Sequence, residues 1–224
     1  MIKVSLRLKA IADYIEKNAK VIDIGCDHAL LAIMLVKSKI VNKVIAVDIS
    51  RGAINQAQKN IEQAKLESKI ALRLGNGLFC LASGEVDTIV LAGLGHHKII
   101  SILKEGKSKL KEINHIVIQS NTNPLLIRKY LCQIGFYIEK EKLVSEKDII
   151  YPIISFKRGK QKYTKKELIL GPHLIKENSP LFKQFIKKEI AKQKQLLLVI
   201  PFQYIHKRRQ IKNYLKNLQV VNDK

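Results

Sequence analysis

Short β-branched segments alternate with helix-forming segments through the first two thirds of the chain, and this alternation limits the possible folds more than any other feature. Segments with the length and composition of buried strands cover residues 20–24, 43–48, 70–74, 86–92 and 115–119. Helix-forming segments follow four of them, at residues 30–38, 51–64, 97–105 and 124–134. Apolar strands connected through helices form a parallel sheet that helices cover on both faces. The sequence therefore predicts an α/β fold, to which residues 136–144 and 149–156 add an antiparallel pair of strands.

The last third of the chain differs in composition, because glycine becomes rare and lysine, glutamine and leucine predominate. Residues 155–224 contain 18 Lys and Arg against four Asp and Glu, and the whole chain contains 41 against 19. We predict a boundary near Gly159, with an α/β domain at residues 1–158 and a basic helical module at residues 159–224.

Helix-start signals organise this module. Thr164 and Glu167 fit a capping box, and Ser179 followed by proline fits the start of a long helix. We predict helices over residues 180–199 and 204–218, the second with Ile205 on its apolar side. Two such helices most simply pack as an antiparallel hairpin.

Charge and cysteine content narrow the class of protein. A formal net charge of +22 favours a polyanionic partner, and nucleic acid is the first expectation. The alternative is that the composition has drifted toward lysine without any consequence for function. No apolar run is long enough to span a membrane, and no secretory signal begins the chain. The three cysteines are far apart, and adjacent His96 and His97 lack a third ligand, so we expect no disulfide, no metal site and a cytoplasmic protein.

The first predicted strand runs into Asp23-Ile-Gly25-Cys-Asp27-His28. Ligands of open α/β sheets bind at the carboxyl ends of strands, where a glycine lets them approach the backbone. Asp27 would repel a diphosphate at the following helix, so a cationic ligand such as S-adenosylmethionine fits better than a dinucleotide. The alternative is a turn glycine flanked by helix-capping carboxylates.

Three further strand ends carry residues of the same kind. Asp48 ends the second strand, where an acidic side chain hydrogen-bonds ribose hydroxyls, or else it caps the next helix. Asn76, before Gly77, can offer its carbonyl oxygen to an adenine amine, although Asn-Gly is also an ordinary turn. Gly93 follows the fourth strand, where an acceptor base should meet the methyl group.

The motifs at residues 6–12, 23–29, 75–78 and 92–95 closely resemble those of the bacterial tRNA adenine-N1 methyltransferases that act at position 22, the TrmK family. The resemblance covers nearly the whole chain. It implies a Rossmann-like class I methyltransferase sheet with a C-terminal all-helical module, S-adenosyl-L-methionine as donor and tRNA as acceptor. The donor contacts that it implies are Arg7, Asp23, Gly25, Asp48, Ile49, Asn76, Gly77 and Gly93.

The resemblance also implies that Asp27 is the catalytic carboxylate, and we expect His28 to orient it. Methylation makes the adenine cationic, so a carboxylate near the methyl path could hold the N6 amine. Leu30 stands where the family has a tyrosine that could stack on the target base, and His96 stands where it has a glycine.

The basic module supplies the expected phosphate contacts. The alternative is a solvated charged helix face. Rival functions are a methyltransferase of another RNA and a catalytically idle RNA-binding protein of the same fold, and we expect a monomer. The predicted tRNA contacts are Lys183, Lys187, Lys188, Lys192, Lys207, Arg208 and Arg209.

Overall fold

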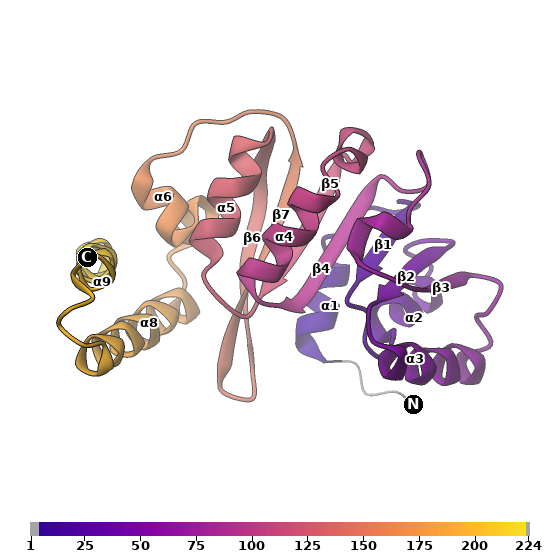
Figure 1. Ribbon diagram of the computed structural model, residues 1–224, viewed down its shortest axis with the longest axis horizontal. Helices are drawn as coiled ribbons and strands as arrows, with labels where there is room; N and C mark the ends of the chain where they lie inside the picture. Colours follow the sequence, from indigo (N-terminus) through magenta and orange to yellow (C-terminus); the bar gives the residue numbers. More distant parts are fainter. Residues whose placement is uncertain (1–4, 223–224) are drawn as a thin grey trace. The chain divides into compact units, whose positions relative to one another are not determined.

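The computed structural model describes residues 5–222 and contains a seven-stranded sheet in the order β3-β2-β1-β4-β5-β7-β6 (Figure 1). Strands β1 to β5 are parallel, and β7 lies antiparallel between β5 and β6. The α/β prediction is therefore confirmed, including the antiparallel last pair. The strands are β1 (Val21–Ile24), β2 (Val44–Asp48), β3 (Ile70–Leu74), β4 (Thr88–Leu94), β5 (His115–Ser120), β6 (Phe136–Glu146) and β7 (Ile149–Arg158).

Helices cover both faces of this sheet. α1, α2 and α3 contact one another in sequence on one face, whereas α4 packs against α5 on the face turned toward the viewer in Figure 1. Two short 3-10 helices, Gly77–Cys80 and Lys109–Glu112, lie in the connections. The α-helices of this part are α1 (Leu6–Ala12), α2 (Leu30–Lys37), α3 (Arg51–Ala64), α4 (His96–Glu105) and α5 (Pro124–Gln133).

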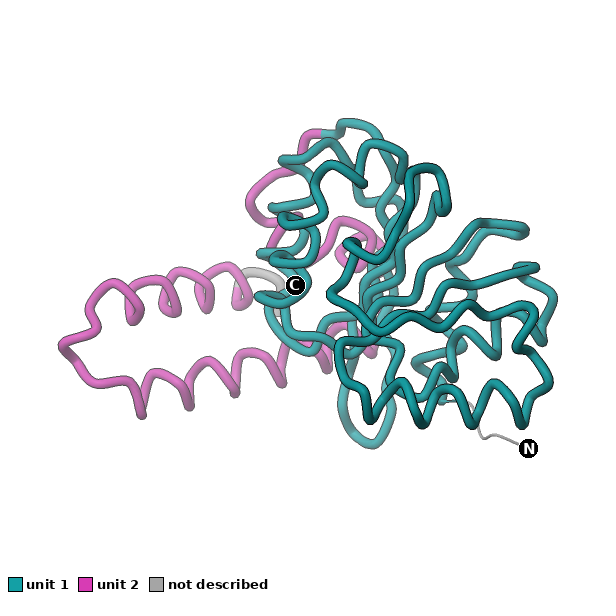
Figure 2. Tube along the Cα trace, turned by 45° about the vertical axis from the view of Figure 1, so that its right-hand side comes forward, with its two compact units in different colours: residues 1–161 teal, residues 162–224 magenta. Residues whose placement is uncertain are grey.

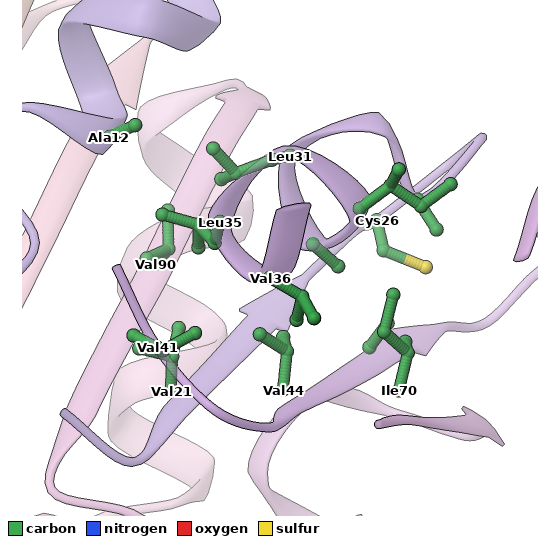
Figure 3. Close-up of a cluster of buried hydrophobic side chains, with 14 of the residues drawn as sticks. Ala12, Val21, Cys26, Leu31, Leu35, Val36, Val41, Val44, Ile70 and Val90 are labelled. Atoms are coloured by element: carbon green, nitrogen blue, oxygen red, sulfur yellow. The ribbon is translucent and has the colours of Figure 1, made fainter. Parts of the chain in front are cut away.

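The core explains why α2 shows little amphipathic pattern. Five of its eight residues are buried, so its apolar side chains face neighbours on several sides. Figure 3 shows Leu31, Leu35 and Val36 of this helix packed among side chains of β1, β2 and β4, such as Val44 and Val90. This packing holds α2 against the sheet, so that the turn between β1 and α2 has a defined position.

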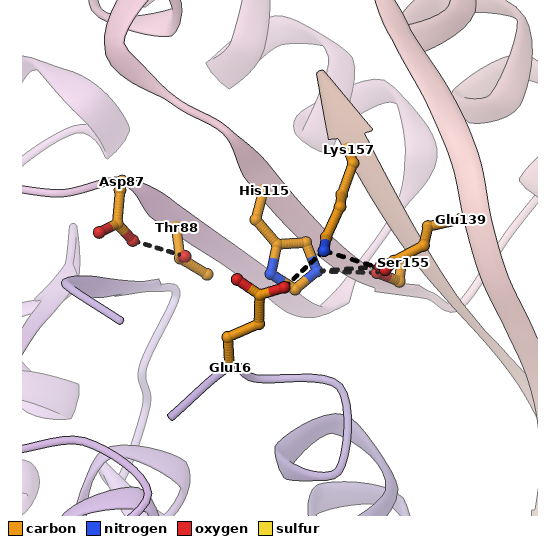
Figure 4. Close-up of polar contacts among 7 residues, drawn as sticks. All are labelled: Glu16, Asp87, Thr88, His115, Glu139, Ser155 and Lys157. Carbon is orange, nitrogen blue, oxygen red and sulfur yellow. Dashed lines mark hydrogen bonds and ion pairs between the residues drawn. The ribbon is translucent and has the colours of Figure 1, made fainter. Parts of the chain in front are cut away.

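A partly buried polar cluster joins β5, β6 and β7 (Figure 4). His115 begins β5, and its Nε2 lies 2.7 Å from Ser155 Oγ, which donates to Glu139 at 2.8 Å. Lys157 Nζ donates to Glu139 at 3.1 Å and to Glu16, after α1, at 2.5 Å. Burial lowers the pKa of His115, while its two carboxylate partners raise the pKa of Lys157 to about 12. These contacts link the three strands at the end of the sheet where β5 begins, opposite the β6–β7 turn.

Residues 162–224 form a second compact unit, and residues 1–161 form the first. The four helices of the second unit are α6 (Lys165–Leu170), α7 (Pro172–Glu177), α8 (Pro180–Val199) and α9 (Ile205–Asn222). The capping box of Thr164 and the Ser179 N-cap form as predicted. α8 and α9 pack as the expected antiparallel hairpin (Figure 2).

Two short helices, α1 and α7, were not predicted, and one local expectation is wrong. α1 was not anticipated, although Ser5 Oγ accepts from the Leu8 amide as an N-cap. The Gly171-Pro172 pair ends α6 but also begins α7, because proline suits the first position of a helix. Ile205 is 69% exposed at the hairpin turn instead of lying on an apolar face.

Candidate functional site

A cavity of about 1120 Å³ opens at the carboxyl ends of the parallel strands. Nine of the ten residues predicted for donor binding and catalysis line it, and the tenth, Asp23, is buried at 3% exposure. The predicted strand-end residues therefore lie around one space. The nine are Arg7, Gly25, Asp27, His28, Asp48, Ile49, Asn76, Gly77 and Gly93.

The turn after β1 carries three residues in left-handed conformations, Gly25, Asp27 and Ala29. Gly25 has a φ of +75°, and its amide donates to Val47 of β2 at 2.8 Å. Asp27 has a φ of +48°, which costs a non-glycine residue about 1–2 kcal/mol. The Asp27 carboxylate is 71% exposed and lies 3.4 Å from His28 Nε2. Ala29 is the N-cap of α2 and makes no side-chain cap, so Asp27 is not a helix-capping carboxylate.

Asp48 links the end of β2 to the turn after β1 through hydrogen bonds. Its carboxylate accepts from the Asp27 amide at 3.1 Å and from the Ser50 amide at 2.9 Å. The N-cap of α3 is Ser50, whose hydroxyl accepts from Ala53, so Asp48 does not cap this helix. Ile49 beside it is 62% exposed at the cavity.

Asn76 and Gly77 form the wall of the cavity after β3. The Asn76 amide group donates to Glu105 at 3.2 Å. Gly77 has a φ of +58°, and a Cβ there would lie 2.9 Å from Ile102 Cγ2. A side chain at this position would therefore force α4 away from the wall.

Buried groups under the cavity have shifted pKa values. Burial, and secondly the negative charge of Asp48, raises the pKa of Asp23 to about 7. Burial and the same two carboxylates raise the pKa of the Cys26 thiol, which therefore stays protonated at neutral pH. A cation bound above β1 would be favoured here, because it would stabilise the ionised form of Asp23.

A hydrogen-bond network that was not predicted joins α1 to the ends of β4 and β5. Gln119 Oε1 accepts from Arg7 Nη1 at 2.6 Å and from the Gly93 amide at 3.0 Å. Asn121 accepts from Gln119 Nε2 at 3.1 Å and donates to the Gly93 carbonyl oxygen at 2.7 Å. Gly93 itself lies within β4, which continues through an irregularity to Leu94 where a turn was expected. Arg7 thus lies over the β4 and β5 ends.

The β6–β7 turn supplies a wall of the cavity that was also not predicted. Glu146, Lys147, Ile149 and Tyr151 line it. The Arg7 guanidinium carbon lies 5.3 Å from the centroid of the Tyr151 ring. No local pattern could have placed this turn at the site, because its position depends on pairing between distant strands.

The predicted tRNA contacts lie on α8 and α9, and six of the seven are exposed. Arg208 is the exception, since it is half-buried and donates to the carbonyl oxygens of Leu197 at 2.7 Å and Ile200 at 2.5 Å. Its guanidinium also lies 4.3 Å from the Phe202 ring centroid. Arg208 therefore stabilises the end of α8 and the hairpin turn.

Residues 5–222 contain neither a membrane-spanning helix nor a cluster of metal ligands. No helix there is long and apolar enough to cross a membrane. No group of three or more His, Cys, Asp or Glu side chains in that range is placed to hold a metal ion.

An open parallel sheet with an antiparallel last pair, a glycine turn after β1 and a carboxylate at the end of β2 defines a Rossmann-like class I methyltransferase. The model of the family TrmK, tRNA (adenine(22)-N(1))-methyltransferase, matches residues 21–222. The chain belongs to this family.

Individual relatives are similar to this chain over most of their own length. The tRNA (adenine(22)-N(1))-methyltransferase of Bacillus subtilis is 31% identical over 81% of this chain and 79% of its own. A Streptococcus pneumoniae protein in complex with S-adenosyl-L-methionine superposes with a TM-score of 0.89 at 31% identity, covering 98% of this chain and 99% of its own. Mycoplasma capricolum TrmK with S-adenosyl-homocysteine superposes with a TM-score of 0.84 at 28% identity, covering 98% of each chain.

Proposed function

We propose that the cavity holds both substrates of a methyl transfer from S-adenosyl-L-methionine to N1 of adenine 22 in tRNA. The observation that carries this proposal is the convergence of nine predicted residues on one cavity, together with an exposed carboxylate at Asp27. tRNA as the acceptor implies action in the cytoplasm. We expect a monomer, which light scattering coupled to gel filtration would test.

The residues present fit a cationic nucleoside better than a diphosphate. Asp27 and Asp48 line the cavity, while the left-handed turn at Gly25 brings the backbone to its surface. Asp48 would accept from ribose hydroxyls, and Asn76 would accept from the adenine amine of the donor. When bound, S-adenosylmethionine supplies a methyl group activated by its sulfonium.

Asp27 is the residue proposed to act on the acceptor. Its carboxylate is exposed at the cavity and caps no helix, and its backbone amide donates to Asp48. It would hold the N6 amine of the target adenine and stabilise the positive charge that develops on the base. His28, 3.4 Å away, would orient it. A strained backbone kept at Asp27 is typical of residues under functional constraint.

The basic module, residues 159–224, is proposed to bind the tRNA backbone. Lysines and arginines on its exposed helix faces give affinity that is independent of sequence and falls with salt. The exposed ones among the predicted contacts are Lys183, Lys187, Lys188, Lys192, Lys207 and Arg209. Arg208 contributes through the hairpin turn, because its hydrogen bonds go to Leu197 and Ile200.

Labelled S-adenosylmethionine and two tRNA transcripts test the function. One transcript carries adenine at position 22, and the other, matched at every other position, carries guanine. We expect label in 1-methyladenosine from the first transcript alone. Label at another nucleotide would indicate a different RNA methyltransferase, and absence of label despite donor binding would indicate an idle RNA-binding protein.

A further inference from the structure

The cavity is larger than donor binding requires, and the residues predicted for the donor do not enclose it. Its volume of about 1120 Å³ exceeds the usual range for one small ligand, roughly 300–1,000 Å³. Part of its wall comes from the end of β5 and the β6–β7 turn, where Asn121, Ile149 and Tyr151 lie. This part of the cavity is therefore available to a second ligand.

The order of strands in the sheet places the wall formed by β5 and the β6–β7 turn far from Asn76, where the adenine of the donor is expected. β3, which precedes Asn76, and β7, which carries Tyr151, are five strand spacings apart. At about 4.8 Å per spacing this is roughly 24 Å, too far for one nucleoside to contact both. A donor that follows β3, β2 and β1 therefore leaves the β5 and β7 ends uncovered.

Strand register brings Tyr151 to the carboxyl end of β5. Gln119 of β5 pairs with Ile153 of β7, so two residues further along the antiparallel pair Tyr151 is level with Asn121. In Figure 1, β6 and β7 extend past the ends of the neighbouring strands. Tyr151 consequently lies past Ser120, the last residue of β5, and lines the cavity.

The Tyr151 ring is supported on one side. The Arg7 guanidinium carbon lies 5.3 Å from its centroid, and Gln119 holds Arg7 at 2.6 Å. Gln119 is fully buried and is itself hydrogen-bonded to Gly93 and Asn121, so this support is rigid. Ile149, which precedes Tyr151 on β7, is 53% exposed and presents apolar surface to the same part of the cavity.

We propose that Tyr151 forms the face on which the extruded target adenine stacks, with Ile149 beside it. The proposal rests on the function proposed above, because it takes an adenine as the acceptor. An unpaired base is recognised by stacking on an aromatic ring and by hydrogen bonds along its edge. Tyr151 would supply the stacking surface that Leu30, after the Asp-His pair, cannot supply. Asp27 would then meet the edge of the base, so stacking and charge stabilisation would come from different elements.

Three variants and one control test this role. Tyr151→Leu removes the ring, Tyr151→Phe keeps it, and Ile149→Ser removes the neighbouring apolar surface with little risk to folding. The control, Tyr130→Leu, removes another half-buried tyrosine that carries a cation over its ring, Lys104 at 5.8 Å, but does not line the cavity. For each, single-turnover methylation is measured over a tRNA series, and donor affinity is measured by calorimetry.

Loss of one base–aromatic stack should lower kcat/KM of Tyr151→Leu by roughly 5- to 150-fold. Tyr151→Phe and Tyr130→Leu should stay near wild type, Ile149→Ser should fall between, and donor affinity should be unchanged in all four. A wild-type rate in Tyr151→Leu, or an equal loss in Tyr151→Phe, would overturn the stacking role. Donor affinity that falls in step with rate would assign Tyr151 to the donor site. Failure of the wild-type protein to methylate adenine 22 would overturn the proposed function itself.

Discussion

Replacing Asp23 by asparagine should stabilise the protein increasingly as the pH rises. Burial raises the pKa of Asp23 from an ordinary 3.8 to about 7. Between these values the folded protein keeps a proton that the unfolded chain has lost, so folding becomes less favourable with rising pH. Above pH 7 the penalty reaches its full size, about 4 kcal/mol for roughly three pKa units. Asparagine does not ionise and escapes this penalty.

The change of the stability difference with pH is a better test than the difference at one pH. Asparagine and aspartic acid differ in hydrogen bonding by an amount that does not depend on pH, and this amount cancels when two pH values are compared. At pH 5.5 the penalty on the wild type is about 2 kcal/mol, and at pH 8 it is about 4 kcal/mol. The advantage of Asp23→Asn should therefore widen by about 2 kcal/mol, or roughly 4–8 °C in Tm. Calorimetric melting of both proteins at the two pH values measures this widening.

A matched control is Asp13→Asn, whose carboxylate is 64% exposed and contacts Lys142. Its stability difference from wild type should show no comparable widening, since an exposed ion pair contributes little. An Asp23→Asn advantage that stays constant or narrows between pH 5.5 and pH 8 would refute the argument from burial.

Three further outcomes are expected. Asp48→Ala should weaken donor binding about 2- to 12-fold in calorimetry, because an acceptor for the ribose hydroxyls is lost; unchanged affinity in a folded variant would contradict the assignment. Asp27→Ala should reduce the single-turnover rate far more than tRNA affinity, and near wild-type turnover would remove it from catalysis. A quadruple alanine variant on the basic module should weaken tRNA binding and flatten the salt slope by about 3, whereas equal slopes would leave those side chains as solvated surface. The four residues are Lys183, Lys187, Lys207 and Arg209.

The sequence contains enough local information to predict the strand ends that line the donor half of the cavity. Asp48 ends one strand and Asn76 follows the next, and parallel strands bring their carboxyl ends to one edge of the sheet. The alternatives left open were resolved only by contacts. Ser50, not Asp48, caps α3, and Ala29 begins α2 without help from Asp27. Which of several neighbouring polar residues caps a helix depends on their backbone angles, and the amino-acid composition does not determine these angles.

The contacts that build the β5 and β7 side of the cavity could not be predicted, because the residues that make them are distant in the chain. Arg7 and Gln119 are separated by 112 residues, yet their side chains are 2.6 Å apart. Tyr151 reaches the cavity only because β7 pairs with β5 as well as β6. The same limit applies to Arg208, which has the composition of a phosphate contact but lies against the end of its own helix hairpin.

The insertion of β7 between β5 and β6 also sets an order of events during synthesis. β5 is buried along its whole length, but one of its edges has no partner until residues 149–158 have been made. A ribosome-bound chain that ends at β6 would therefore expose an apolar strand edge, which is prone to wrong pairing. Tyr151 lies on β7, so the nascent protein cannot complete the wall proposed to face the target adenine before β7 has paired with β5. Translation products that end at β6 would thus lack β7, Tyr151 and the basic module proposed to bind tRNA.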